Sequence, residues 1–277
     1  MKRFLFVVLL ILSSILLFNS IDREDVIAEF DPLKIEIGEM FEYLNYEKEM
    51  YVLNYQIADI DDNGENDLVI VIGEKTEESD FYKNIDVIVY NQTNEMFTAA
   101  KLKNYEGKMP RIELDDVAGD KVRDVILIAT CKNNDNSMSI VSFNEKGAKE
   151  IFKSKESKGL EISGQILDGF KARITIKNLK QEFEVDLSEN KENYITNGFY
   201  LENGKLNTDK VKISSAGIYN IELIKIDDKV GVKYTERIKG FDNLDIIDQL
   251  KVLIKYDNGK WSIVEVISER FGKVVWC

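Results

Sequence analysis

The sequence predicts an all-β fold built from repeated antiparallel sheets. Short apolar or alternating runs recur along the chain between turn residues, whereas helical periodicity is scarce. Two acidic loops lie 57 residues apart, and each leads directly into an apolar run. Hydrophobic residues make up 44% of the 277 residues, which is enough to bury a substantial core. We expect a single β domain over residues 21–277, preceded by a separate segment over residues 1–20.

The first 20 residues have the pattern of an export signal. Lys2 and Arg3 form a positive start, and the apolar run of residues 4–18 follows. That run is shorter than the roughly 20 residues that span a bilayer, which favours a signal peptide. Because Asn19 and Ser20 make a poor cleavage site, an uncleaved signal anchor stays open. We expect an extracellular or cell-envelope protein that contacts a membrane only through this segment.

Nine runs after the signal have the composition and period of β-strands. They are residues 68–72, 85–90, 125–130, 138–143, 172–176, 183–187, 231–234, 250–256 and 261–266. Asn258 and Gly259 separate the last two runs, which predicts a β-hairpin. Residues 25–30 and 243–250 are the two places where a turn or two of helix is expected. Asp242, Asp245 and Asp248 would then line one helical face, more plausibly a solvated face than a site.

The most informative motif is the acidic loop of residues 59–67, which reads DIDDNGEND. Side-chain oxygens stand at loop positions 1, 3, 5 and 9, and a backbone carbonyl is offered at position 7. Calcium (Ca²⁺) takes six to eight oxygen ligands of these kinds. Gly64, at position 6, permits the sharp turn that such a loop needs. The predicted ligands are Asp59, Asp61, Asn63, Glu65 and Asp67.

Two other interpretations of this loop need to be compared with a calcium site. An EF-hand needs an acid at position 12 and helices on both sides, but Ile70 occupies that position and a strand pattern follows. The remaining alternative is an acidic Asn-Gly turn that joins two strands without an ion.

A weaker copy of the loop occurs at residues 116–124, DVAGDKVRD. Asp116, Asp120 and Asp124 keep positions 1, 5 and 9 and form a possible second ion site. Ala118 removes the ligand at position 3, and Lys121 replaces the glycine. The other interpretation is a turn held by hydrogen bonds from backbone N–H groups to aspartates. A third copy, at residues 223–231, keeps only Asp227 and is expected to bind nothing.

The unit of loop and strand is similar to the FG-GAP and VCBS-type repeat, in which a calcium loop precedes a blade strand. More closely, residues 50–266 resemble exported FG-GAP/VCBS-type proteins of spore-forming Firmicutes, through the matching residues 58–74, 116–128 and 217–238. The FG and GAP signatures that name the repeat are absent from these loops. A repeat of about 55 residues with about four strands is the size of one propeller blade. The resemblance implies a β-propeller-like array of roughly four to five antiparallel blades.

Charge and composition exclude several classes of function. A net charge of −13 disfavours nucleic-acid binding, which needs clustered Lys and Arg. The absence of histidine removes the commonest general base and the commonest zinc ligand. Cys131 and Cys277 are too few for a disulfide scaffold, and whether they pair is left open.

These observations favour an exported, non-catalytic β-repeat protein with one calcium-binding loop. Such a protein would serve as a binding or structural module of the cell envelope or the spore, with an envelope protein or a polysaccharide as partner. One alternative is a glycan-active hydrolase that uses paired carboxylates such as Asp59 and Asp116. Another is a membrane-anchored assembly or sensor subunit that keeps residues 1–20.

Overall fold

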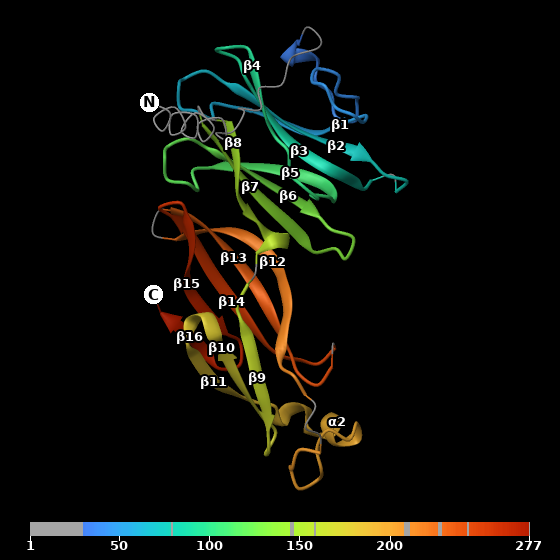
Figure 1. Ribbon diagram of the computed structural model, residues 1–277, viewed down its shortest axis with the longest axis vertical. Helices are drawn as coiled ribbons and strands as arrows, with labels where there is room; N and C mark the ends of the chain where they lie inside the picture. The colour runs from blue at the N-terminus through green and yellow to red at the C-terminus, as the bar shows by residue number, and fades with distance from the viewer. Residues whose placement is uncertain are drawn as a thin grey trace, which may run out of the picture.

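Four antiparallel sheets and little helix make up the described part of the chain, which confirms the predicted all-β class. Each sheet joins strands that are consecutive in sequence. Along the long axis of the molecule the sheet of residues 51–100 is followed by the sheet of residues 108–153 and then by the sheet of residues 214–276, with the sheet of residues 162–186 beside the last (Figure 1). The computed structural model describes residues 30–78, 80–144, 147–157, 159–207, 211–226, 229–242 and 244–276.

The first two sheets have four strands each and repeat the same plan. The first sheet comprises β1 (Tyr51–Ala58), β2 (Asp67–Lys75), β3 (Tyr82–Asn91) and β4 (Met96–Ala100). The second sheet comprises β5 (Lys108–Asp115), β6 (Asp124–Thr130), β7 (Asn136–Asn144) and β8 (Gly147–Lys153). Strand β1 contacts β5, and β4 contacts β8, so the two sheets stack strand over strand. The spacing of 57 residues between the loops is also the spacing from β1 to β5 and from β2 to β6.

The C-terminal half contains a three-stranded and a five-stranded sheet. The third sheet comprises β9 (Ile162–Leu167), β10 (Lys171–Ile176) and β11 (Gln181–Asp186). The fourth sheet comprises β12 (Ser214–Ile226), β13 (Lys229–Lys239), β14 (Ile246–Asp257), β15 (Lys260–Ser268) and β16 (Gly272–Trp276).

Helical segments in the described residues are short. They are the 3₁₀ turns Pro32–Lys34, Ser154–Glu156, Lys177–Leu179 and Ser188–Asn190, and the α-helix α2 (Lys191–Thr196). None of the helices in this part of the chain has the length and apolar character needed to cross a bilayer. Residues 1–29, on which the predicted export signal and the first helical turn fall, lie outside the described residues.

Strand β2 is buried on both faces, which explains its unbroken apolar sequence. Val69 and Val71 pack in the core between the first and second sheets. Leu68, Ile70 and Ile72 point to the opposite face, where they pack with residues of the 35–50 segment. The first sheet is therefore an internal layer, covered by the second sheet on one face and by residues 35–50 on the other.

Strand β6 occupies the same kind of position one layer further along the stack. Val125 and Leu127 face the first sheet, whereas Ile126 and Ile128 join the core that continues into the C-terminal half. Trp261 connects the two halves directly, because its Nε1 donates a hydrogen bond to the carbonyl oxygen of Ile151 at 2.7 Å. The predicted all-β chain is thus a series of layers that share cores.

The hairpin predicted near the C-terminus is confirmed. Asp257 of β14 pairs with Lys260 of β15 across a two-residue turn. Asn258 and Gly259 have φ angles of 50° and 79°, the left-handed conformation that the tightest hairpin turns require.

Two sequence predictions in the C-terminal half were wrong. The helix expected at residues 243–250 is absent from the described residues there, because β14 begins at Ile246 and pairs with β13 and β15. Ile247, Leu250 and Val252 are fully buried on this strand, and tertiary pairing overrides the spacing of the acids. Asp248, expected on a solvated face, is 2% exposed and accepts a hydrogen bond from Ser268 Oγ at 2.5 Å.

The third acidic loop does not form either. Residues up to Ile226 belong to β12 and residues from Lys229 belong to β13, and Ile224 pairs with Gly231. A short hairpin therefore replaces the nine-residue loop expected at residues 223–231. Asp227 lies outside the described residues.

Candidate metal centre

The loop of residues 59–67 connects β1 to β2 at one edge of the stacked sheets. Ala58 and Asp67 pair across the base of the loop, so Asp67 is the first residue of β2. Its side chain is 1% exposed, and its Oδ2 accepts the Ile60 N–H at 3.1 Å. Ile60 is itself buried and anchors the start of the loop in the core between the first two sheets.

Asp59 and Asn63 hold the loop in shape through backbone N–H groups. Asp59 accepts hydrogen bonds from the N–H of Asn63 at 3.2 Å and of Gly64 at 2.9 Å. The side-chain oxygen of Asn63 accepts the Glu65 N–H at 2.7 Å. Asp62 and Gly64 have φ angles of 58° and 89°, and this alternation of left-handed residues turns the chain back toward its start.

Three of the five predicted ligands converge at this site. Asp59, Asp61 and Asp67 each place a carboxylate oxygen within 4.8 Å of the others. Such a group of acids is found nowhere else among the described residues. The side-chain oxygen of Asn63 accepts the Glu65 N–H, and the Glu65 carboxylate, from which no ligand was expected, lies outside this group of acids.

One carboxylate oxygen of Asp67, the buried Oδ1, lacks a hydrogen-bond partner. Burial raises the pKa of the Asp67 carboxyl and the charges of Asp61 and Asp59 raise it further, although the N–H groups of Ile60 and Gln92 act in the opposite direction. A buried carboxylate beside two other acids is costly without compensation, and a bound cation would supply that compensation.

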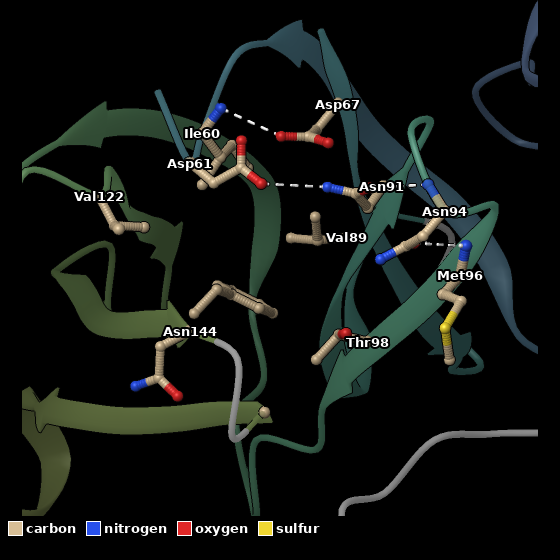
Figure 2. Close-up of a pocket in the computed structure, with 12 residues that line it drawn as sticks. Ile60, Asp61, Asp67, Val89, Asn91, Asn94, Met96, Thr98, Val122 and Asn144 are labelled. Atoms are coloured by element: carbon tan, nitrogen blue, oxygen red, sulfur yellow. Dashed lines mark hydrogen bonds between the residues drawn. The ribbon is translucent and has the colours of Figure 1, made fainter. Parts of the chain in front are cut away.

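Asn91, which the sequence analysis did not identify, connects this site to the neighbouring turn. It lies at the end of β3, and its Nδ2 donates to Asp61 Oδ2 at 3.2 Å (Figure 2). Its Oδ1 accepts the N–H of Asn94, in the turn between β3 and β4, at 3.1 Å. The one sequence signal for this role is the polar turn that follows the apolar run of β3.

The loop of residues 116–124 repeats the same hydrogen-bond frame. Asp116 accepts the N–H groups of Gly119, Asp120 and Lys121, at 2.6, 3.1 and 2.9 Å. Asp124 is the counterpart of Asp67, and the left-handed residues Gly119 and Lys121, with φ angles of 76° and 72°, are the counterparts of Asp62 and Gly64.

The second loop differs in how its buried acid is used. Asp124 Oδ2 accepts two N–H groups, those of Val117 at 2.8 Å and Ala118 at 2.7 Å. Burial raises the pKa of Asp124 to about 6, against these hydrogen bonds, which lower it. Asp116, Asp120 and Asp124 do not form a group close enough to share an ion in the described residues. Two backbone N–H groups and the Ser142 side chain, not a cluster of acids, stabilise this carboxylate.

The two acids considered for acid–base chemistry, Asp59 and Asp116, occupy equivalent positions in the two loops. Each accepts backbone N–H groups of its own loop. Both acids therefore make the hydrogen bonds expected of residues that stabilise a turn. Of the two cysteines, Cys131 is half-buried with a free thiol, and Cys277 lies outside the described residues.

Comparison with known proteins adds one result for the C-terminal half. Residues 160–268 match the family model of the YybI C-terminal domain. The matched segment contains β9 to β15 and therefore belongs to the third and fourth sheets, whereas the candidate metal centre lies outside it. No curated protein and no solved structure matches the chain.

Proposed function

We propose that the loop of residues 59–67 binds one calcium ion that stabilises the first sheet, in an exported and non-catalytic β-repeat protein. The observation that carries this proposal is the buried, unpartnered Oδ1 of Asp67 beside Asp59 and Asp61. The three carboxylates together carry more negative charge than a divalent ion can neutralise. Because they repel one another, binding of the ion would relieve that repulsion.

The donor set favours calcium over other metals. All candidate ligands are oxygens, and the chain has no histidine, so zinc and the later transition metals lack their usual partners. Calcium accepts irregular shells of six to eight oxygens, whereas magnesium demands a near-ideal octahedron. A loop that combines carboxylates with amide and backbone oxygens suits the larger ion.

The finer architecture that we propose is a propeller-like array in which the first two sheets are blades of the FG-GAP/VCBS type. Support comes from their common plan, since each has four consecutive strands with the acidic loop between its first and second strand. Stacking of β1 on β5 and of β4 on β8 is the packing expected of neighbouring repeat units.

The cellular setting that we propose is the exterior or envelope of the cell, where the protein acts as a binding or structural module. Support comes from the signal pattern of residues 1–20 and from the net charge of −13. Asp59 and Asp116 each accept backbone N–H groups of their own loop, and this structural use of both acids supports a non-catalytic role.

Calorimetric titration and thermal unfolding test the calcium proposal. We expect one ion per chain and a melting temperature that rises with calcium and falls with chelator. At a free concentration one hundred times the Kd, the ion would stabilise the fold by about 2.7 kcal/mol. Asp61→Ala should abolish both binding and the calcium-dependent rise.

Asp62→Asn provides the matched control. It removes one negative charge from the same loop without removing a predicted ligand, and asparagine tolerates the left-handed φ of 58° at this position. This variant should keep calcium binding. An unchanged melting temperature of the wild-type protein in EDTA would refute the proposed function.

A further inference from the structure

We propose that the cleft beside the calcium loop binds a neutral carbohydrate, with the bound ion forming part of the binding site. This inference rests on the proposed calcium site and adds a ligand class to it. Three features of the cleft support it, namely its position, its polar groups and its apolar side chains.

The cleft lies between the first and second sheets and has a volume of about 700 Å³. That volume is within the range of 300–1,000 Å³ typical of small-molecule sites. Asp61 and Asp67 line it, so two of the three converging carboxylates form part of its wall (Figure 2). An ion held by these acids would therefore lie at the edge of the cleft.

The polar lining suits hydroxyl groups. Asn91, Asn94, Asn144 and Thr98 contribute amides and a hydroxyl, which both donate and accept hydrogen bonds as sugar hydroxyls do. No Lys or Arg is among the lining residues, and the three carboxylates exceed the charge of a bound divalent ion, so an anionic ligand such as a phosphate would still meet net negative charge. The lining favours an uncharged, hydroxyl-rich ligand.

The apolar lining suits the C–H faces of a sugar ring. Val89, Met96, Val122 and Phe143 contribute this part of the cleft. Val89 and Met96 lie on β3 and β4 of the first sheet, whereas Phe143 lies on β7 of the second sheet and Val122 in the loop before β6. Apolar surface with a few converging polar groups is the usual composition of a ligand site.

Hydrogen bonds connect the ion site to the wall of the cleft. Asp61 accepts from Asn91, Asn91 accepts from the Asn94 N–H, and the side chain of Asn94 accepts the Met96 N–H at 3.1 Å (Figure 2). An ion that fixes Asp61 would thereby fix the amides that face the ligand. Calcium takes six to eight oxygens and three carboxylates of the loop converge, so sugar hydroxyls can help to complete the shell.

The experiment is a screen of neutral and acidic oligosaccharides on an array, in calcium and in EDTA, followed by calorimetry on the bound glycans. We expect neutral glycans to bind in calcium and to be released by EDTA. No bound glycan, binding of acidic glycans alone, or binding that is equal in EDTA would each overturn the inference.

Titration with calcium alone separates this inference from the proposed function. If calcium binds and no glycan does, only the inference fails. If calcium itself does not bind, the proposed function fails and the ion-dependent carbohydrate site fails with it.

Thr98→Val and Thr175→Val form a matched pair of variants. Both threonines are half-buried on strands, but only Thr98 lines the cleft, whereas Thr175 lies on β10 of the third sheet. Thr98→Val should weaken glycan binding about tenfold, the effect of one lost hydrogen bond. Thr175→Val should leave glycan affinity unchanged, and both variants should bind calcium as the wild type does. Equal glycan affinity in the two variants would place the ligand outside this cleft.

Discussion

The loops of residues 59–67 and 116–124 share one backbone frame but satisfy their buried acid differently. In both loops the first acid accepts consecutive backbone N–H groups, and left-handed residues stand at positions 4 and 6. Asp67 has one buried oxygen without a partner beside two acids, whereas Asp124 Oδ2 receives two N–H groups. The Oδ1 of Asp124 is also unpartnered, but the structure places no cluster of acids around it.

This difference shows that the turn and the ion site are separable. Ala118 stands where the first loop has Asp61, and the second loop still folds into the same shape. The acids at positions 1 and 9 therefore accept backbone hydrogen bonds whether or not the loop has an acid at position 3. The acid at position 3 is what distinguishes a candidate calcium loop from a structural turn.

The largest expected effect comes from removing the buried acid of the second loop. Asp124→Ala removes the side-chain acceptor of the Val117 and Ala118 N–H groups, of which only Val117 keeps another acceptor among the described residues, the Asp115 carbonyl at 3.1 Å. Near pH 5, where the raised pKa keeps the carboxyl largely protonated, we expect a loss of about 4 kcal/mol in the free energy of unfolding. Urea denaturation, in calcium and in EDTA, should give the same loss under both conditions.

Asp120→Ala is the control for that measurement. Asp120 belongs to the same loop but is exposed, and it accepts one N–H, that of Val122, at 3.1 Å. It should cost about 1 kcal/mol or less. If the two variants cost the same, Asp124 does not hold the loop together.

The pH dependence of stability separates the charge of Asp124 from its hydrogen bonds. Because burial raises the folded-state pKa from 3.8 to about 6, the folded chain retains the proton through this window and its stability falls as pH rises. The shift corresponds to about 3 kcal/mol. Asp124→Asn cannot ionise, so its unfolding free energy in EDTA should fall less between pH 4 and pH 7. An identical slope in both proteins would contradict the raised pKa.

A graft of ligands into the second loop tests whether position 3 decides ion binding. Ala118→Asp combined with Lys121→Gly restores the missing carboxylate and the missing glycine. We expect calorimetry to find two calcium ions per chain, one more than we expect for the wild type, with up to about 2.7 kcal/mol of added stability at one hundred times the Kd of the new site. Lys121→Gly alone should still bind one ion, and a single ion in the double variant would show that the frame itself differs.

The smallest effect concerns the residue at position 6. Lys121 has a φ of 72°, which costs a residue with a β-carbon about 1 kcal/mol, whereas Gly64 adopts its φ of 89° without that strain. Lys121→Gly should raise the free energy of unfolding by about 1 kcal/mol, and Gly64→Ala should lower it by a similar amount. Thermal and urea unfolding measure both, and a loss of stability in Lys121→Gly would mean that the lysine side chain contributes contacts of its own.

The sequence predicted the interior strands because each of them buries at least one apolar face. Strands β2 and β6, which are buried on both faces, have continuous apolar runs, whereas β10 alternates buried and more exposed residues and was predicted from its period of two. The strands that the pattern did not single out lie at sheet edges, such as β1, where Tyr55, Gln56 and Ile57 are exposed. Edge strands carry mixed and bulged sequences, so their assignment depends on partners that periodicity does not show.

The candidate site was predictable in its loop but not in its surroundings. The spacing of oxygens in residues 59–67 identified Asp59, Asp61 and Asp67, which do converge. Asn91 lies 30 residues away in sequence and reaches Asp61 only because β2 and β3 pair. The cleft could not be foreseen, since it depends on how the second sheet stacks against the first.

The meandering order of all four sheets has a consequence for how the chain folds. Every described ladder joins strands that are neighbours in sequence. A chain that emerges N-terminus first from a ribosome or a translocation channel can therefore close each sheet once its own last strand has appeared. No strand of a sheet has to wait for a distant partner, so little edge is left open to other chains during synthesis.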